Sequence, residues 1–193
     1  MTVEIFWEEA MPRIKVVEEE NAEGKVKVVY DQLKSMVGLV PGLMKALSPW
    51  PEVLELYATR IGMIMFSETL LTRAVKEMIA ALVSKINGCD YCLTYHKSFM
   101  VDAGVSSPEA EAIVADYQMA AITEAEKKLL AYAEKVTRHA YKTTDADVTG
   151  LKECGWSEAQ ILEATLVVGL FCDINRWVDA LGFRYEDDRA LPG

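Results

Sequence analysis

The sequence predicts an all-α protein that folds as a helical bundle, and three observations carry this prediction. Strand-like alternation is nearly absent, apart from a short extended segment at Lys15–Val17. Apolar residues recur at helical spacing, as Leu54, Ala58 and Ile61 do. Helix-capping signals recur along the chain, with a capping box at Thr123–Glu126 as the clearest.

Each expected helix begins after a cap or a break and ends at a glycine or another break. Pro51 suits the first position of a helix, and Gly88 suits the left-handed residue that ends one. In chain order the expected elements are Lys25–Val37, a short turn from Val40–Leu43, Pro51–Phe66, a helix from Thr69 or Thr72 to Asn87, Cys89–Ala103, a helix from Ser106, Leu129–His139, a helix from Thr144, and Ser157–Phe183.

The length of 193 residues predicts a single domain over residues 1–193. Residues 1–20 are expected to form an N-terminal arm, and residues 184–193 a frayed polar tail. Residues 123–170 repeat the order of capped helices found in residues 51–87, which favours an internal duplication of a helical unit.

Charge and composition exclude several classes of partner. With 20 basic and 30 acidic residues the net charge is −10, so neither a nucleic acid nor an anionic membrane surface is an expected partner. The acidic N-terminal stretch has no signal-peptide pattern, and no apolar run reaches the roughly 18 residues of a membrane span. Four cysteines do not make a secreted disulfide framework, so a reducing cytoplasm is the expected location.

Four residues form the most informative cluster of the chain: Glu77, Cys89, Cys92 and His96. Spacings of 3, 4 and 7 place Cys89, Cys92 and His96 on one face of a helix. If the chain turns back at Gly88, two arms of roughly 13–15 Å bring Glu77 alongside His96. A carboxylate would then orient an imidazole that faces a thiol, which is the logic of a catalytic triad with sulfur as nucleophile.

A reactive cysteine must be a thiolate, and the sequence offers two ways to stabilise one. The helix N-terminus favours an anion at Cys89, whereas His96 can take the proton of Cys92. These local arguments leave open which sulfur reacts. A pair of thiols suits peroxide reduction, since one becomes a sulfenic acid and the other condenses with it to a disulfide, which an external dithiol reduces.

At these residues the chain resembles the alkylhydroperoxidase D (AhpD)-like proteins of the carboxymuconolactone decarboxylase superfamily. The matching pattern is Glu77, Cys89, Tyr91, Cys92 and His96. Further segments resemble the peroxidase-related branch of that superfamily: Val40–Leu43, Lys45–Leu47, Pro51-Glu52 and Phe171–Leu181. The resemblance spans roughly residues 20–183, with its specificity in the stretch from Glu77 to His96.

The resemblance implies an all-helical AhpD-like subunit, a homo-oligomer (trimer or hexamer), and peroxide reduction without a cofactor or a metal. Cys92 would attack the peroxide, Cys89 would resolve, and His96 with Glu77 would relay protons. A dihydrolipoyl group or another dithiol would recycle the pair. One departure is Cys172, which stands where the family usually has Asn. It is either a packing change or a third thiol near the site.

Other readings of the same residues stay open. A decarboxylase or lactone-handling enzyme could use this fold without its cysteines. A non-enzymatic redox sensor or a zinc-binding helical oligomer is the alternative outside enzymes, although Cys89, Cys92 and His96 are one ligand short of a structural zinc site. Cys154 and Cys172 are expected to be small buried apolar residues, and His139 a partner of a helix C-terminus.

Overall fold

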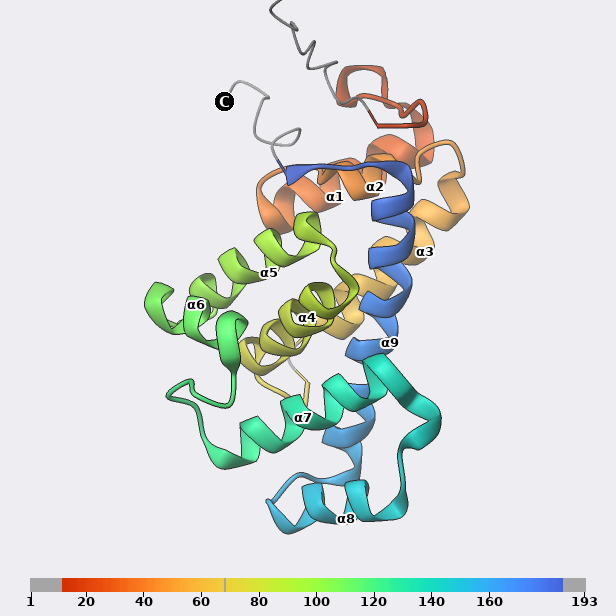
Figure 1. Ribbon diagram of the computed structural model, residues 1–193. Helices are drawn as coiled ribbons and strands as arrows, with labels where there is room; N and C mark the ends of the chain where they lie inside the picture. Colours follow the sequence, from red (N-terminus) through yellow and green to blue (C-terminus); the bar gives the residue numbers. More distant parts are fainter. Residues whose placement is uncertain (1–11, 68, 186–193) are drawn as a thin grey trace, which may run out of the picture.

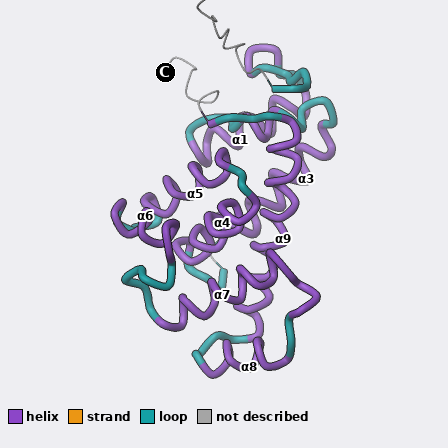
Figure 2. Tube along the Cα trace, in the orientation of Figure 1, coloured by secondary structure: helices purple, strands orange, loops and turns teal. Residues whose placement is uncertain are grey.

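A computed structural model of the protein describes residues 12–67 and 69–185, and over these ranges it is helical without any strand (Figures 1 and 2). The predicted all-α fold class is confirmed. The α-helices are α1 (Gly24–Val37), α2 (Gly42–Lys45), α3 (Pro51–Ile61), α4 (Arg73–Asn87), α5 (Asp90–Asp102), α6 (Ser107–Asp116), α7 (Glu124–His139), α8 (Asp145–Glu153) and α9 (Glu158–Leu181). Two short 3₁₀ turns, η1 (Glu19–Asn21) and η3 (Ala140–Lys142), and a π-helical turn, η2 (Gly62–Phe66), complete them.

The helix boundaries follow the capping signals of the sequence. Thr72, rather than Thr69, caps α4 by accepting a hydrogen bond from the Val75 backbone N–H. Ser106 caps α6 in the same way, and capping boxes start α7 at Thr123 and α9 at Ser157. These caps satisfy N–H groups that the first turn of a helix leaves without partners.

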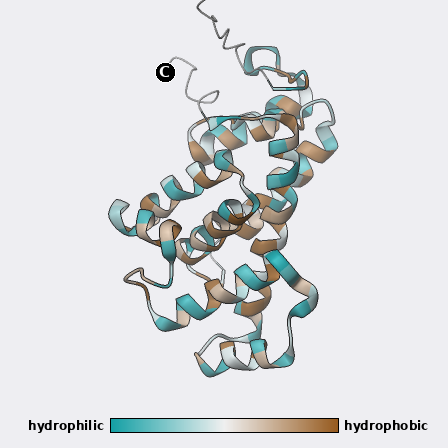
Figure 3. Ribbon diagram, viewed as in Figure 1, coloured by the Kyte–Doolittle hydropathy of each residue, from teal (hydrophilic) through white to brown (hydrophobic). Residues whose placement is uncertain are grey.

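Helix α4 is the central element of the bundle and packs against α5, α7 and α9 (Figure 1). Every residue from Val75 to Ser84 is buried. Most of the other helices carry both hydrophilic and apolar residues, as the mixed colours of Figure 3 show. Within α4 the charged residues Lys76 and Glu77 are also buried, so both need partners inside the protein.

A second, smaller core lies under α1 and α2. It includes Val29 and Tyr30 of α1, Met44 of α2 and Leu54 of α3. Tyr30 donates a hydrogen bond of 2.8 Å to the Val17 carbonyl, which ties the extended residues before α1 to this layer. The N-terminal helices are therefore packed as a cover next to the main core.

Several expectations stay predictions. The N-terminal arm and the tail lie partly outside the described residues, which include only 12–20 of the arm and 184–185 of the tail. The single domain and the internal duplication also stay predictions. Over the described residues, none of the helices has the length and apolar character needed to cross a membrane.

Candidate active site around Cys92

A helical hairpin brings the four candidate residues together, as the sequence predicts. Gly88 adopts φ of 78° at the end of α4, and its N–H group and that of Cys89 bond back to the last carbonyls of the helix. Helix α5 then returns along α4. As a result Glu77 Oε2 lies 2.5 Å from His96 Nδ1, although the two residues are far apart along the hairpin.

Glu77 is fully buried and is held from two sides. Its other oxygen, Oε1, accepts a hydrogen bond of 2.5 Å from Arg73 Nε, one helical turn earlier. The Arg73 guanidinium lies over the ring of Phe66, 3.9 Å from the ring centre. The buried carboxylate is thus paired and its geometry is fixed on a rigid helix.

His96 is almost completely buried, and its orientation is fixed by Glu77 and by Phe171 of α9. The imidazole meets the Phe171 ring edge-on, with ring centres 4.2 Å apart. Because a carboxylate only accepts hydrogen bonds, Nδ1 carries the hydrogen and Nε2 is left as the proton acceptor. Cys92 lies one helical turn before His96, so its thiol shares the face of α5 that bears the imidazole.

A small cavity opens beside these residues. Its volume is about 80 Å³, well under the roughly 300–1,000 Å³ of pockets for drug-sized ligands. Glu77, Cys92 and His96 line it together with aromatic rings from three helical segments, η2, α5 and α9. Those rings belong to Phe66, Tyr91, Tyr95, Phe99 and Phe171. The cavity therefore suits a small ligand with an apolar part.

Helices α1 and α2 close the cavity from the N-terminal side. Leu33 and Val37 of α1 and Leu43 and Met44 of α2 are among its lining residues. The Leu43 N–H group donates a 3.2 Å hydrogen bond to the Tyr91 hydroxyl, which links α2 to the cysteine motif. Tyr91 thus packs beside the cavity and holds α2 by a hydrogen bond.

The two cysteines have different surroundings. Cys89 is the N-cap residue of α5, fully buried, and it does not line the cavity with Cys92. The expectation that Cys89 shares one helical face with Cys92 and His96 is therefore wrong, because Cys89 stands just outside the helix. Both cysteines are free thiols, and they hydrogen-bond to each other.

The expectation that the helix N-terminus favours a thiolate at Cys89 is also corrected. The hydrogen bond with the Cys92 thiol, followed by burial, raises the pKa of Cys89 far above its ordinary value. These two effects outweigh the partial charges of the helix end. Cys89 is therefore a protonated thiol at neutral pH, and Cys92 is the sulfur that has both a base and a cavity.

The remaining cysteines lie outside this cavity. Cys154 and Cys172 are half-buried and not fully buried as expected, because Cys154 is the C-terminal cap of α8 and Cys172 turns from the cavity toward Asn87. Cys172 is not a third thiol of the site. His139 ends α7, where its expected interaction with the helix C-terminus is possible. Within the described ranges no group of three His, Cys, Asp or Glu side chains is placed to hold a metal ion.

Two neighbours of the site were missed at the sequence level. Arg73 lies one turn before Glu77, so the spacing of opposite charges on a helix could have shown it. Phe171 comes from a helix 75 residues after His96, and no local signal pairs them.

The candidate site is thus a helical hairpin with two adjacent thiols and a buried Glu–His pair beside one of them. Residues 51–135 match the family described as Carboxymuconolactone decarboxylase family. No curated protein matches the sequence. This match supports the resemblance to the AhpD-like, peroxidase-related proteins of the carboxymuconolactone decarboxylase superfamily that the motif indicates.

Solved structures share this fold over most of their length. An uncharacterized peroxidase-related protein from Silicibacter sp. TM1040 is 26% identical, with 91% of this chain and 90% of that chain covered and a TM-score of 0.79. An uncharacterized peroxidase-related protein with an AhpD core, from Ralstonia eutropha JMP134, is 22% identical. The match covers 90% of this chain and 91% of that chain, with a TM-score of 0.83.

The debrominase Bmp8 has the same fold. A cysteine-to-alanine variant of it, in complex with 2,3,4-tribromopyrrole, is 17% identical to this chain, with 89% and 90% covered and a TM-score of 0.77. At this identity the likeness shows a shared fold with a debrominase.

Proposed function

We propose that the protein is a thiol-dependent peroxidase that reduces an organic hydroperoxide or hydrogen peroxide at Cys92. The observation that carries the proposal is the 2.5 Å contact between Glu77 and His96, one helical turn from a thiol that lines a small cavity. A base oriented by a buried carboxylate next to a nucleophile is the arrangement that nucleophilic catalysis requires.

In the first step His96 Nε2 takes the proton of the Cys92 thiol, and Glu77 stabilises the resulting imidazolium. The thiolate attacks the peroxide, so that a sulfur–oxygen bond forms and the oxygen–oxygen bond breaks. The leaving alkoxide or hydroxide takes a proton from His96. Cys92 is then a sulfenic acid, the peroxide has become an alcohol or water, and Glu77 and His96 have returned to their first state.

In the second step Cys89 attacks the oxidised sulfur of Cys92. Their thiols already contact each other, so a disulfide needs little movement. Water leaves, and an external dithiol reduces the disulfide in the third step. A dihydrolipoyl group or another dithiol fits this part of the cycle, which the resemblance to AhpD-like proteins suggests.

The cavity favours small hydroperoxides with an apolar group. Its aromatic lining gives no hydrogen-bonding pattern for a larger polar substrate, and its volume is about 80 Å³. The carboxymuconolactone decarboxylase match keeps a decarboxylase or lactone-handling activity as the second candidate. That chemistry does not use the two thiols, so it must survive their removal.

The test is turnover of cumene hydroperoxide with dihydrolipoamide as reductant. We expect turnover in the wild type and in Cys172→Ala, which removes a thiol outside the cavity. Cys92→Ala is expected to lose turnover altogether. If a double variant, Cys89→Ala with Cys92→Ala, still consumes the hydroperoxide at the wild-type rate, the proposal is wrong. A lactone substrate processed equally by the double variant would support the second candidate.

A further inference from the structure

A second cavity lies next to the cysteine motif and differs in character from the first. It is a polar surface depression of about 580 Å³. Gly88, Asp90 and Thr94 line it from the hairpin, and Asp179 lines it from α9. Arg13 and the segment from Gly182 to Tyr185 complete the rim. Tyr91 lines both cavities, so the motif lies between them.

The two cavities meet different faces of α5. Cys92 and His96, one turn apart, face the apolar cavity. Asp90 and Thr94, also one turn apart, face the polar one. Residues two positions apart on an α-helix point to nearly opposite sides, so the start of α5 presents one side of the motif to each cavity.

Asp179 connects the polar cavity to Cys89. Its carboxylate is a hydrogen-bond partner of the Cys89 thiol, which is fully buried behind it. Arg13 fixes the backbone at this point, because its guanidinium donates bonds of 3.0 Å and 2.8 Å to the Asp179 and Ala180 carbonyls. The carboxylate thus lines the polar cavity and also bonds the buried Cys89 thiol.

The position of Asp179 is unfavourable for the helix that carries it. It lies in the last turn of α9, which ends at Leu181, and a negative charge near a helix C-terminus opposes the helix dipole. Partial burial and the neighbouring Asp90 raise the pKa of Asp179, while its bond with Cys89 acts in the opposite direction. Contact with Cys89, and not helix stability, accounts for an acid at this place.

We propose that Asp179 is the acid–base residue of Cys89, and that the external dithiol reaches Cys89 through the polar cavity. This inference rests on the proposed function and assigns the second half of its cycle. The peroxide would react on the apolar side at Cys92, and the reductant on the polar side at Cys89.

The chemistry balances with Asp179 in this role. When Cys89 attacks the Cys92 sulfenic acid, its thiol proton moves to Asp179, a sulfur–sulfur bond forms, and the sulfur–oxygen bond breaks. The hydroxide that leaves takes a proton from solvent and becomes water, because His96 is already neutral at this point. Asp179 then holds a proton, next to the disulfide that the reductant must open.

Reduction uses that proton. A thiolate of the dithiol attacks Cys89, and Cys92 leaves beside His96. This direction is favoured because Cys89, whose thiol pKa is raised, is the poorer leaving group. The first attack leaves a mixed disulfide between the reductant and Cys89. The second thiol of the reductant then attacks the reductant sulfur of this disulfide, and Cys89 leaves and takes the proton of Asp179. Two electrons pass from the dithiol to the protein.

The experiment measures the reduction step alone. The Cys89–Cys92 disulfide is formed with diamide, without any peroxide, and its reduction by dithiothreitol is followed by stopped flow. We expect Asp179→Asn to slow reduction by about tenfold or more, within the range of general acid catalysis. Asp102→Asn is the control, since it removes the same charge from an exposed position at the far end of α5 that lines neither cavity. We expect it to stay within about twofold of the wild type.

A conservative variant separates catalysis from structure. Asp179→Glu keeps a carboxyl group and is expected to recover most of the rate. Equal reduction rates for Asp179→Asn and Asp102→Asn would overturn the proposal, as would a failure of diamide to join Cys89 to Cys92. The two proposals can fail separately. If the wild type does not react with hydroperoxide while Asp179→Asn still slows reduction of the disulfide, the peroxidase function is wrong and the role of Asp179 stands.

Discussion

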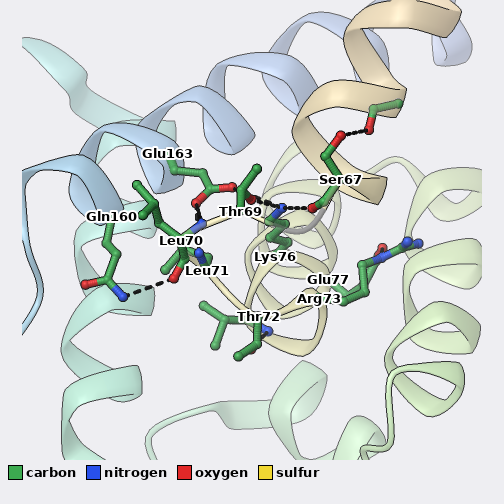
Figure 4. Close-up of polar contacts among 12 residues, drawn as sticks. Ser67, Thr69, Leu70, Leu71, Thr72, Arg73, Lys76, Glu77, Gln160 and Glu163 are labelled. Carbon is green, nitrogen blue, oxygen red and sulfur yellow. Dashed lines mark hydrogen bonds and ion pairs between the residues drawn. The ribbon is translucent and has the colours of Figure 1, made fainter.

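Two neighbouring residues of α4, Lys76 and Glu77, are both charged and both buried, yet they belong to different networks. Lys76 is 1% exposed and Glu77 0%. One residue apart on a helix, they point in different directions. Figure 4 shows Lys76 pointing toward the loop before α4 and toward α9, with Glu77 and Arg73 on another side of the helix.

The Lys76 network holds backbone. Lys76 Nζ bonds to the Ser67 carbonyl at 3.1 Å and pairs with Glu163 at 3.0 Å. Glu163 accepts the N–H groups of Leu70 and Leu71, which fixes the loop to the first turns of α9 (Figure 4). Each charged member of this group is bonded to backbone groups and to an oppositely charged side chain.

The Glu77 network instead ends at a titratable group and a cavity. Its partner His96 can change charge, and Cys92 lies one turn away beside the same cavity. A buried charge alone therefore does not mark a catalytic residue in this protein. The distinction lies in what the charge contacts: backbone for Lys76, a base next to a thiol for Glu77.

The largest expected effect is that of Glu77→Gln on rate. Without the carboxylate, His96 loses the group that orients it and stabilises its charged form. We expect oxidation of Cys92 by hydroperoxide to slow about 10³-fold, while the fold is retained. Stopped-flow oxidation and thermal unfolding measure the two quantities. A variant that loses stability but keeps its rate would place Glu77 with Lys76 as a structural charge.

Lys76→Met is expected to have the opposite result. Glu163 would lose a buried partner but keep its backbone donors, so the free energy of unfolding should fall by about 3 kcal/mol. The rate of Cys92 oxidation should stay within about threefold, since Lys76 does not reach the cavity. Denaturant unfolding and single-turnover kinetics test this. A large loss of rate in a well-folded variant would show that the two networks are coupled.

Arg73→Lys sharpens the comparison within the Glu77 network. Lysine keeps the positive charge but cannot reproduce the planar guanidinium that bonds Glu77 and lies over Phe66. We expect about a tenfold slower oxidation of Cys92, between the wild type and Glu77→Gln. If Arg73→Lys reacts as fast as the wild type, the salt bridge to Arg73 is not needed to position Glu77.

Glu163→Gln should show a small, pH-dependent loss of stability. Burial alone would raise the pKa of Glu163, but its bonds with Thr69, Lys76 and the Leu71 N–H lower it below the ordinary value. A lowered pKa in the folded state stabilises the protein above the unfolded-state pKa, and this stability is lost as the pH falls through the folded-state pKa.

The melting temperatures of wild type and Glu163→Gln should therefore differ by roughly 2–4 °C at neutral pH. The difference should narrow below about pH 4, where Glu163 binds a proton in the unfolded chain before it does so in the folded protein. A gap that stays constant down to pH 3 would indicate that the loss comes from geometry and not from ionisation.

Local signals predicted much of the fold and part of the site. The caps at Thr72, Ser106, Thr123 and Ser157 and the left-handed Gly88 are short-range features, so the sequence contained what was needed to place them. The pairing of Glu77 with His96 followed from the hairpin at Gly88, because the two arms have similar lengths.

The rest depended on how α9 crosses α4 and α5. Phe171 contacts His96, and Asp179 contacts Cys89, because α9 packs along the hairpin. No residue spacing in the sequence predicts where α9 crosses the hairpin. The raised pKa of the Cys89 thiol was also not predicted from the sequence. The helix end was the visible local effect, whereas burial and the second thiol, which decide the pKa, are tertiary.

The central claim is that Cys92 is the sulfur that peroxide oxidises. The most direct measurement treats reduced Cys89→Ala protein with one equivalent of cumene hydroperoxide, traps sulfenic acid with dimedone, and locates it by peptide mass. A dimedone adduct on Cys92, formed far more slowly when Glu77→Gln is added, is the predicted result. An unmodified Cys92, together with an adduct on Cys89 in the Cys92→Ala protein, would contradict the account and exchange the roles of the two thiols.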